Sequence, residues 1–249
     1  MMAICVQAHR GASGYAPENT LPAFQKAIDL GADGIETDIH YTLDGRFAVC
    51  HDDTLERTSD GQGTVSGKTI EQLKAYDFGC HFEPRPAEPV RLPVLEELLE
   101  LVREMDVINI EIKELPPDPA QRREAAETLL RILRDFTCGS RVILSSFQHE
   151  WLREIKERAP KLRTGLLYGA QNKYSLEYTL AMAKKFRADY IHPYLYMMDP
   201  DLVSGCRRQG IGCNVWTVDT PEAIDFAIAL EPDGIISDYP DRVLRALGR

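Results

Sequence analysis

The chain has 249 residues, of which 44% are hydrophobic, and this is enough to bury one large core. We therefore expect a single catalytic or binding domain over residues 1–249. The 29 lysines and arginines are outnumbered by 39 aspartates and glutamates, and the net charge of −10 argues against a nucleic-acid partner or an anionic lipid surface.

The first residues run directly into a strand-like segment, and no apolar run approaches the length needed to cross a membrane. The six cysteines include no Cys-x-x-Cys pair, so the sequence indicates neither a disulfide framework nor a zinc site. We expect a soluble, cytoplasmic protein without stable membrane insertion. The sequence leaves the oligomeric state open.

Short β-branched segments alternate with segments of helical periodicity along the chain, as is typical of βα units around a parallel sheet. The pattern predicts eight strands, at residues 4–9, 34–42, 107–113, 142–147, 163–169, 189–195, 212–218 and 234–239. The first predicted helix begins at Pro17 and stops at Gly31. Further helices are predicted at 94–104, 120–136, 149–159, 175–186, 199–209 and 220–230.

Eight strands with intervening helices predict an α/β fold of the TIM (β/α)8 barrel type. An open, doubly wound sheet is the alternative architecture. A short additional strand at 46–52 follows the second barrel strand, and the segment after it is much longer than a usual βα connection. We therefore expect a small insertion at 53–92, over one face of the barrel.

Acidic side chains gather near the ends of two predicted strands, where a barrel builds its active site. Glu36 and Asp38 alternate with Ile35 and Ile39, so the two carboxylates share one face of their strand, and Glu111 lies near the end of the next barrel strand. Three converging carboxylates would repel one another unless a cation lay among them. Oxygen-only donors favour one divalent cation, Mg²⁺ or Ca²⁺, over zinc.

Basic side chains and histidines occur at the same strand ends. His9 and Arg10 end the first strand, His51 ends the short additional strand, and Lys113 follows Glu111 by two residues. A metal ion, a guanidinium and an ammonium group together are typical of a phosphate-binding site. Two histidines would supply the proton acceptor and the proton donor that cleavage of a phosphodiester needs.

Two sequence blocks carry a resemblance to the glycerophosphodiester phosphodiesterase family. "HRGASGYAPENT" at 9–20 is similar to the opening His-Arg-Gly…Pro-Glu-Asn-Thr motif of that family, and "GIETDIHYTLDGRFAVCHDDTLERTSDGQG" at 34–63 is similar to its Glu-x-Asp…His-Asp…Leu-x-Arg-Thr block. "INIEIK", "VWTVDTPE" and "DGIISDYPD" continue the likeness towards the C-terminus.

The resemblance implies a TIM barrel with a small domain inserted at 53–92. It also implies a phosphoric diester hydrolase with a small-molecule substrate, a glycerophosphodiester such as glycerophosphocholine or glycerophosphoethanolamine. The products would be glycerol 3-phosphate and an alcohol, and the glycerol hydroxyl of the substrate would attack first to give a cyclic phosphate. The implied roles are acid/base catalysis for His9 and His51, metal binding for Glu36, Asp38 and Glu111, phosphate binding for Arg10 and Lys113, an apolar wall for Trp216, and support of the first loop for Glu18 and Asn19.

Two other functions remain open at this point. One is a phosphodiesterase of the lysophospholipase D or sphingolipid type on the same barrel, which an exposed apolar rim on the insertion would favour. The other is a non-catalytic binder of phosphorylated metabolites, which could dispense with one of the candidate catalytic residues. The segment 53–92 is mostly polar, and all the candidate residues are present.

Overall fold

Eight parallel strands close into a barrel in the computed structural model of the chain, which describes residues 3–114, 116–136, 141–169 and 175–249. The first strand pairs with the second strand on one side and with the last strand on the other, and this closure confirms the TIM barrel and excludes an open sheet. The barrel strands are β1 (Cys5–His9), β2 (Gly34–Tyr41), β4 (Val107–Ile112), β5 (Val142–Ser146), β6 (Arg163–Tyr168), β7 (Tyr190–Pro193), β8 (Gly212–Val215) and β9 (Gly234–Ser237).

Every predicted strand is present, and the differences lie at the strand ends. The short additional strand is β3 (Phe47–Val49), which pairs antiparallel with β2. The strand predicted at 189–195 ends at Pro193, because the chain then turns into the short 3₁₀ helix η1 (Leu195–Met197). Proline lacks the N–H that a continuing strand would need, which is consistent with this early end.

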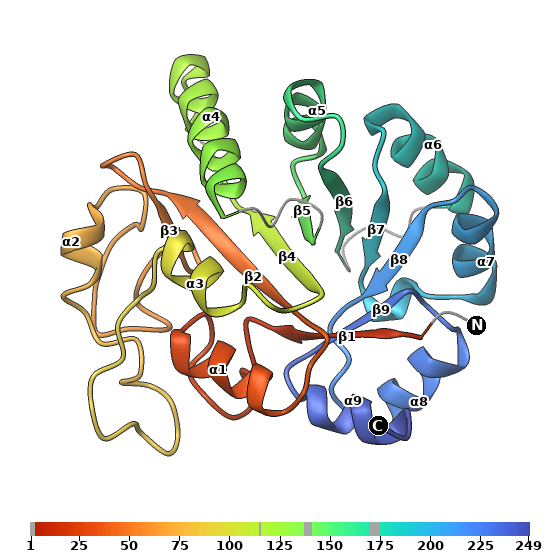
Figure 1. The fold of residues 1–249 in the computed structure, drawn as a ribbon, viewed down its shortest axis with the longest axis horizontal. Coiled ribbons are helices and arrows are strands. Elements are labelled where there is room, and N and C mark those ends of the chain that lie inside the picture. Colours follow the sequence, from red (N-terminus) through yellow and green to blue (C-terminus); the bar gives the residue numbers. More distant parts are fainter. Residues whose placement is uncertain (1–2, 115, 137–140, 170–174) are drawn as a thin grey trace.

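The helices surround the barrel (Figure 1). Two were not predicted: α2 is a single turn within the insertion, and α9 is a short helix that begins at Pro240, three residues after the end of the last strand. Both are too short for a helical period to be visible in the sequence. The helices are α1 (Leu21–Asp29), α2 (Ile70–Leu73), α3 (Leu95–Leu101), α4 (Pro119–Asp135), α5 (His149–Arg158), α6 (Leu176–Phe186), α7 (Pro200–Arg208), α8 (Pro221–Ala229) and α9 (Pro240–Ala246).

The start of α1 differs from the prediction. The sequence predicts a helix from Pro17, but the helix begins at Leu21, with Thr20 as the N-cap whose side chain accepts a hydrogen bond from the N–H of Ala23. Asn19 has a φ of 56°, which a helix does not allow. The residues from Pro17 to Thr20 therefore form a turn, and this turn directs polar side chains towards the barrel mouth.

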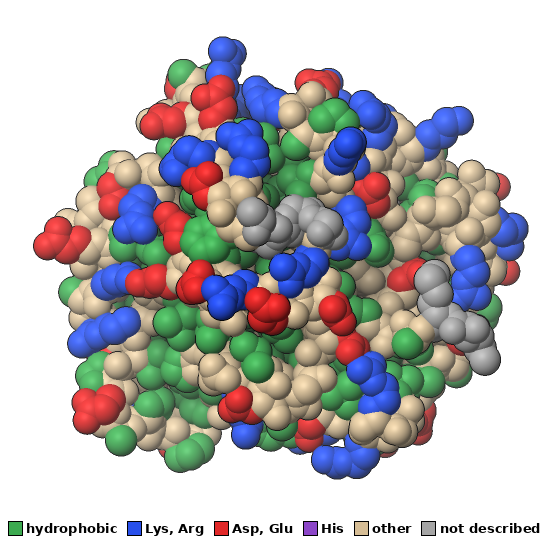
Figure 2. Space-filling model, in the orientation of Figure 1, with side chains coloured by type: hydrophobic (Ala, Val, Ile, Leu, Met, Phe, Trp, Pro, Cys, Tyr) green, Lys and Arg blue, Asp and Glu red, His purple; other side chains and the backbone are tan. Residues whose placement is uncertain are grey.

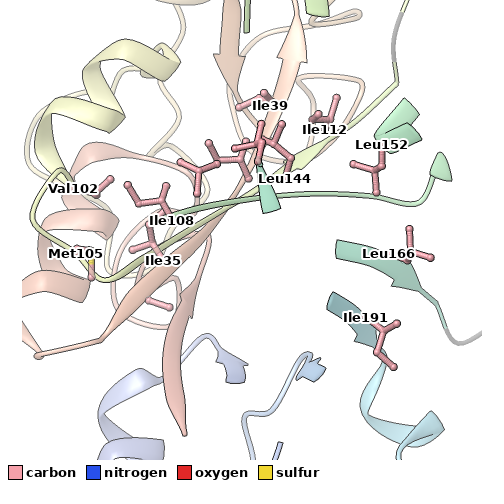
Figure 3. Packing of buried hydrophobic residues seen from close by; sticks show 14 of the residues in the cluster. Ile35, Ile39, Val102, Met105, Ile108, Ile112, Leu144, Leu152, Leu166 and Ile191 are labelled. Atoms are coloured by element: carbon pink, nitrogen blue, oxygen red, sulfur yellow. The ribbon is translucent and has the colours of Figure 1, made fainter. Parts of the chain in front are cut away.

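The hydrophobic core lies between the barrel strands and the surrounding helices. Figure 3 shows Ile35 and Ile39 of β2, Ile108 and Ile112 of β4, and Leu144 of β5 in one buried layer. These residues alternate along their strands with side chains that point into the barrel. Burial of the outward face therefore fixes the polar residues of the same strands on the interior face.

The insertion has a small hydrophobic cluster of its own. Leu55, Val65, Ile70 and Leu73 are buried together within it, next to the residues that flank β3. The turn of α2 is stabilised by a capping box, in which Thr69 and Gln72 exchange side-chain and backbone hydrogen bonds. In Figure 1 this segment lies at one side of the barrel, beyond β3. The division of the chain into one catalytic domain over 1–249 with an insertion at 53–92 stays a prediction.

The surface carries both signs of charge. On the face drawn in Figure 2, acidic and basic side chains are interspersed among hydrophobic ones. Among the described residues, no helix combines the length and the apolar character that a bilayer span requires. The five cysteines in this part of the chain are free, and Cys138 lies outside the described residues.

Candidate active site

Three carboxylates converge at the C-terminal end of the barrel. The register of the sheet pairs His9 with Glu36 and Asp38 with Glu111, so residues from β1, β2 and β4 lie side by side. One ligand oxygen from each of Glu36, Asp38 and Glu111 lies within 4.8 Å of the others, and all three residues are buried. The convergence expected from the strand pattern is therefore present.

Two cations lie against this cluster. Lys113 Nζ is 2.8 Å from Asp38 Oδ1 and 2.6 Å from Glu111 Oε1, and Arg10 Nε is 3.5 Å from Asp38 Oδ2. Burial alone would raise the pKa of Asp38, but Lys113 and Arg10 outweigh it and hold that pKa well below its usual range. Asp38 is therefore ionised and forms the centre of the charge network.

The other two carboxylates are poorly compensated. Burial, followed by the negative charges of Asp38 and Glu111, raises the pKa of Glu36 well above its usual value. Burial also raises the pKa of Glu111 to about 7, although Lys113 opposes this shift. A further cation between the three carboxylates would allow all of them to ionise, and oxygen donors of this kind suit Mg²⁺ or Ca²⁺. The residues therefore fit a divalent metal ion.

Two histidines face the same cavity, and each has one ring nitrogen next to a carboxylate. His9 Nδ1 is 2.6 Å from Asp238 Oδ1, while its Nε2 lies 3.9 Å from Glu36 Oε2. His51 Nδ1 is 2.6 Å from Asp52 Oδ1, and burial lowers the pKa of His51. A carboxylate on Nδ1 orients the imidazole and leaves Nε2 free to exchange a proton with a ligand.

Arg10 is held by the turn that precedes α1. It has a φ of 57°, and its Nη1 donates a hydrogen bond of 2.8 Å to Glu18 Oε1. Its Nε is buried without a hydrogen-bond partner among the described residues. Asn19 accepts a hydrogen bond from Thr37 Oγ1 and donates one of 2.8 Å to Asp38 Oδ2. Glu18 and Asn19 therefore fix Arg10 and Asp38, as supports of the site would.

Trp216 closes one side of the site. Its Nε1 donates a hydrogen bond of 2.8 Å to the carbonyl oxygen of His192, and its ring packs against Phe147 and Tyr194. A cavity of about 50 Å³ separates Trp216 from the histidines. Its lining includes His9, Arg10, Glu36, His51, Glu111 and Trp216.

A larger cavity of about 600 Å³ opens outward from the same residues. His51, Lys113 and Glu111 line its inner end, and Phe147 belongs to the lining of both cavities. Its remaining lining is mostly polar and includes Asp52, Asp53, Thr54, Glu114, Ser146 and Gln148. This space is large enough for a small-molecule group that extends beyond the inner cavity.

All ten residues predicted for the site belong to one connected group, and their individual roles remain predictions. Sequence reasoning missed Asp238 as the partner of His9 and Arg57 as a partner of Asp52. Asp238 follows directly after β9, and the rule that polar residues at strand ends of a barrel face the active site would have found it. Arg57 lies in the quoted Leu-x-Arg-Thr block, but its contacts depend on how the insertion folds.

The comparisons with known proteins agree with this geometry. Residues 9–242 match the model of the glycerophosphoryl diester phosphodiesterase family. The chain is 40% identical to the glycerophosphodiester phosphodiesterase of Caldanaerobacter subterraneus subsp. tengcongensis, over 98% of this chain and 97% of that protein.

Two solved structures are similar over nearly the whole chain. The glycerophosphodiester phosphodiesterase of Thermotoga maritima is 30% identical, with a TM-score of 0.78 and all of both chains covered. A phosphodiesterase of Oleispira antarctica, solved in complex with the product sn-glycerol-3-phosphate, is 25% identical, with a TM-score of 0.84 over 98% of this chain and 96% of that chain.

Proposed function

Because the chain belongs to the glycerophosphoryl diester phosphodiesterase family and is a glycerophosphodiester phosphodiesterase, we propose that it uses one divalent cation and two histidines to release glycerol 3-phosphate. The observation that carries this proposal is the set of groups around one cavity: the imidazoles of His9 and His51, the guanidinium of Arg10, and the carboxylates of Glu36 and Glu111. Together these groups can bind a phosphate, stabilise its developing charge and move two protons.

Glu36, Asp38 and Glu111 would hold the cation. Bound there, a divalent ion would compensate the negative charge of the phosphate and of the transition state. The raised pKa values of Glu36 and Glu111 support this assignment, because burial and then the charge of the neighbouring carboxylates disfavour their ionised forms, and a bound cation would oppose both effects. Binding of the ion would favour the ionised form of both carboxylates.

Arg10 and Lys113 would bind the phosphate oxygens. The buried Nε of Arg10 lies 3.5 Å from Asp38 Oδ2 but makes no hydrogen bond among the described residues, and a phosphate oxygen would supply an acceptor. Lys113 lies between Asp38 and Glu111, so its ammonium group is adjacent to the carboxylates that would hold the ion. Trp216 would form the apolar wall against the glycerol carbons.

The two imidazoles would move the protons. One accepts the proton of the attacking glycerol hydroxyl as the new phosphorus–oxygen bond forms, and the other donates a proton to the headgroup oxygen as its bond to phosphorus breaks. The headgroup leaves as an alcohol and a cyclic phosphate remains. Water then opens this ring with the two imidazoles in exchanged roles, which restores both protonation states.

The direct test measures glycerol 3-phosphate released from glycerophosphocholine. We expect EDTA to abolish release and Mg²⁺ or Ca²⁺ to restore it. His51→Ala should lower kcat at least about 100-fold while the affinity for the metal ion stays unchanged. A variant that retains the normal rate would remove His51 from the mechanism, and full activity in EDTA would remove the metal ion.

We further propose that the enzyme prefers glycerophosphodiesters with a cationic headgroup, such as choline or ethanolamine. The outer cavity contains Asp53 and Glu114 beyond His51 and Lys113, and Phe147 offers an aromatic ring at the junction of the two cavities. Carboxylates and an aromatic ring are the groups that attract an alkylammonium ion. Apart from Ile112 and Phe147, the residues that line this cavity are polar or charged, which favours a small charged headgroup over the long acyl chain of a lysophospholipid.

The headgroup proposal is tested by comparing kcat/KM for glycerophosphocholine with kcat/KM for glycerophosphoglycerol, a substrate whose headgroup is uncharged. Exposed ion pairs contribute about 0.2–1 kcal/mol, so Glu114→Gln should lower the preference for choline about 1.4- to 5-fold. Glu124→Gln, an exposed carboxylate on α4 outside this cavity, is the matched control. An unchanged preference in Glu114→Gln would contradict the proposal, as would faster cleavage of lysophosphatidylcholine.

A further inference from the structure

Arg57 joins two carboxylates that hold different parts of the candidate active site. Its Nε and Nη2 donate hydrogen bonds of 2.5 and 3.0 Å to the two carboxylate oxygens of Asp52. Its Nη1 and Nη2 donate hydrogen bonds of 2.7 Å to the two carboxylate oxygens of Glu18. All three nitrogens of the guanidinium are therefore engaged, in a planar arrangement that the single ammonium group of lysine cannot reproduce.

Each of these carboxylates has a second partner in the site. Glu18 Oε1 also accepts the hydrogen bond of 2.8 Å from Arg10 Nη1, and Asp52 Oδ1 lies 2.6 Å from His51 Nδ1. A continuous series of hydrogen bonds therefore runs from Arg10 through Glu18, Arg57 and Asp52 to His51. It connects the loop after β1 with the start of the segment after β3.

The backbone around Arg57 is fixed by the insertion. Leu55 is fully buried in the small cluster of that segment, its N–H donates to the carbonyl oxygen of Gly63, and its carbonyl oxygen accepts from the N–H of Ser59. The side chain of Arg57 then reaches Glu18, 39 residues earlier in the chain. Because this side chain is 48% exposed, its ion pairs add little to global stability.

The hydrogen bonds and the charge of Arg57 lower the pKa of both carboxylates. Its hydrogen bond is the main reason that the pKa of Asp52 is lowered to about 2. Burial raises the pKa of Glu18, but Arg57 and Arg10 outweigh burial and lower it. As anions, both groups bind their second partners more strongly than neutral carboxylic acids would.

We infer that Arg57 is a positioning residue that fixes the guanidinium of Arg10 and the imidazole of His51 relative to each other, through Glu18 and Asp52. This inference rests on the proposed function, which assigns phosphate binding to Arg10 and proton transfer to His51. Misplacement of a reacting group by about 1 Å costs on the order of 100-fold in rate. The insertion would then contribute to catalysis through one side chain.

The test compares Arg57→Ala and Arg57→Lys with Arg85→Ala. Arg85 lies in the same insertion and makes a single ion pair with Asp77, so its removal breaks an exposed arginine–carboxylate contact away from the site. We expect Arg57→Ala to lower kcat about 10- to 100-fold, Arg57→Lys to recover only part of this loss, and Arg85→Ala to have little effect. The melting temperature of each of the three variants should lie no more than about 4 °C below that of the wild type.

Chemical rescue separates positioning from a general structural role. Guanidinium or methylguanidinium, added far below denaturing concentrations, should restore part of the activity of Arg57→Ala but not that of His51→Ala. Wild-type kcat in Arg57→Ala would overturn the inference, as would a loss that follows the melting temperature and is not rescued. If His51→Ala also has the wild-type rate, the proposed function itself fails, whereas an inactive His51→Ala beside an active Arg57→Ala refutes only the role of Arg57.

Discussion

The contact between Asp238 and His9 provides a sharp test of the proposed proton transfer. Burial raises the pKa of Asp238, but the hydrogen bond with His9 outweighs it, so the pKa is lowered and the carboxylate is ionised. An ionised carboxylate accepts a hydrogen bond from Nδ1–H of His9, across 2.6 Å, and this leaves Nε2 directed towards Glu36. In Asp238→Asn the amide can donate to Nδ1 instead, which favours the opposite tautomer.

The expected loss follows from the strength of this contact. A hydrogen bond to a charged group contributes about 1.5–3 kcal/mol, and about 1.36 kcal/mol changes a rate tenfold. If the contact is needed in the transition state, Asp238→Asn should lower kcat about 10- to 160-fold, with a smaller change in KM. The assay is release of glycerol 3-phosphate from glycerophosphocholine at saturating metal ion.

Ser13→Ala is the matched control. Ser13 Oγ donates a hydrogen bond of 2.9 Å to the same Oδ1 of Asp238, so its loss disturbs the carboxylate without removing the partner of His9. We expect this variant to retain most of the wild-type kcat. The reasoning is refuted if Asp238→Asn keeps kcat within about threefold of the wild type, which corresponds to a difference of under about 1 kcal/mol in the activation free energy. It is also refuted if Ser13→Ala loses as much activity as Asp238→Asn.

Three further predictions concern metal binding, packing and pH. Glu111→Gln should weaken Mg²⁺ binding at least about tenfold in calorimetry, and unchanged affinity would exclude this side chain as a ligand. Leu98 is fully buried between α3 and the barrel, so Leu98→Ala should lower the free energy of unfolding by about 2–5 kcal/mol in urea, with a value below 1 kcal/mol contradicting the packing. Burial lowers the pKa of His192 from 6.5 to about 3, so the unfolded chain binds a proton that the folded chain does not. The contribution of His192 to stability is therefore complete above pH 6.5 and is lost as the pH falls towards 3. Over this range the free energy of unfolding should fall by up to about 1.4 kcal/mol per pH unit because of His192. In His192→Gln the free energy of unfolding should fall less steeply over the same range. Equal slopes for wild type and variant would contradict this effect.

Local sequence pattern predicted the architecture well because it depends on periodicity. Ile35 and Ile39 alternate with Glu36 and Asp38, and burial of the isoleucines against the helices leaves the carboxylates inside the barrel. The same argument failed at Pro17. A proline at the start of an apolar period is a typical helix signal, but Thr20 provides the N-cap, and the turn before it supplies Glu18 and Asn19 to the site.

The sequence by itself determined the barrel class, the interior faces of the strands and the chemical types of the groups at their ends, because these follow from spacing along the chain. Only the tertiary structure decided which of these groups touch. Asp238 meets His9 across 229 residues because closure of the barrel pairs β9 with β1, and Arg57 meets Glu18 because a buried cluster folds the insertion towards the loop after β1. Such contacts depend on strand register and on packing between distant segments, which no local spacing encodes.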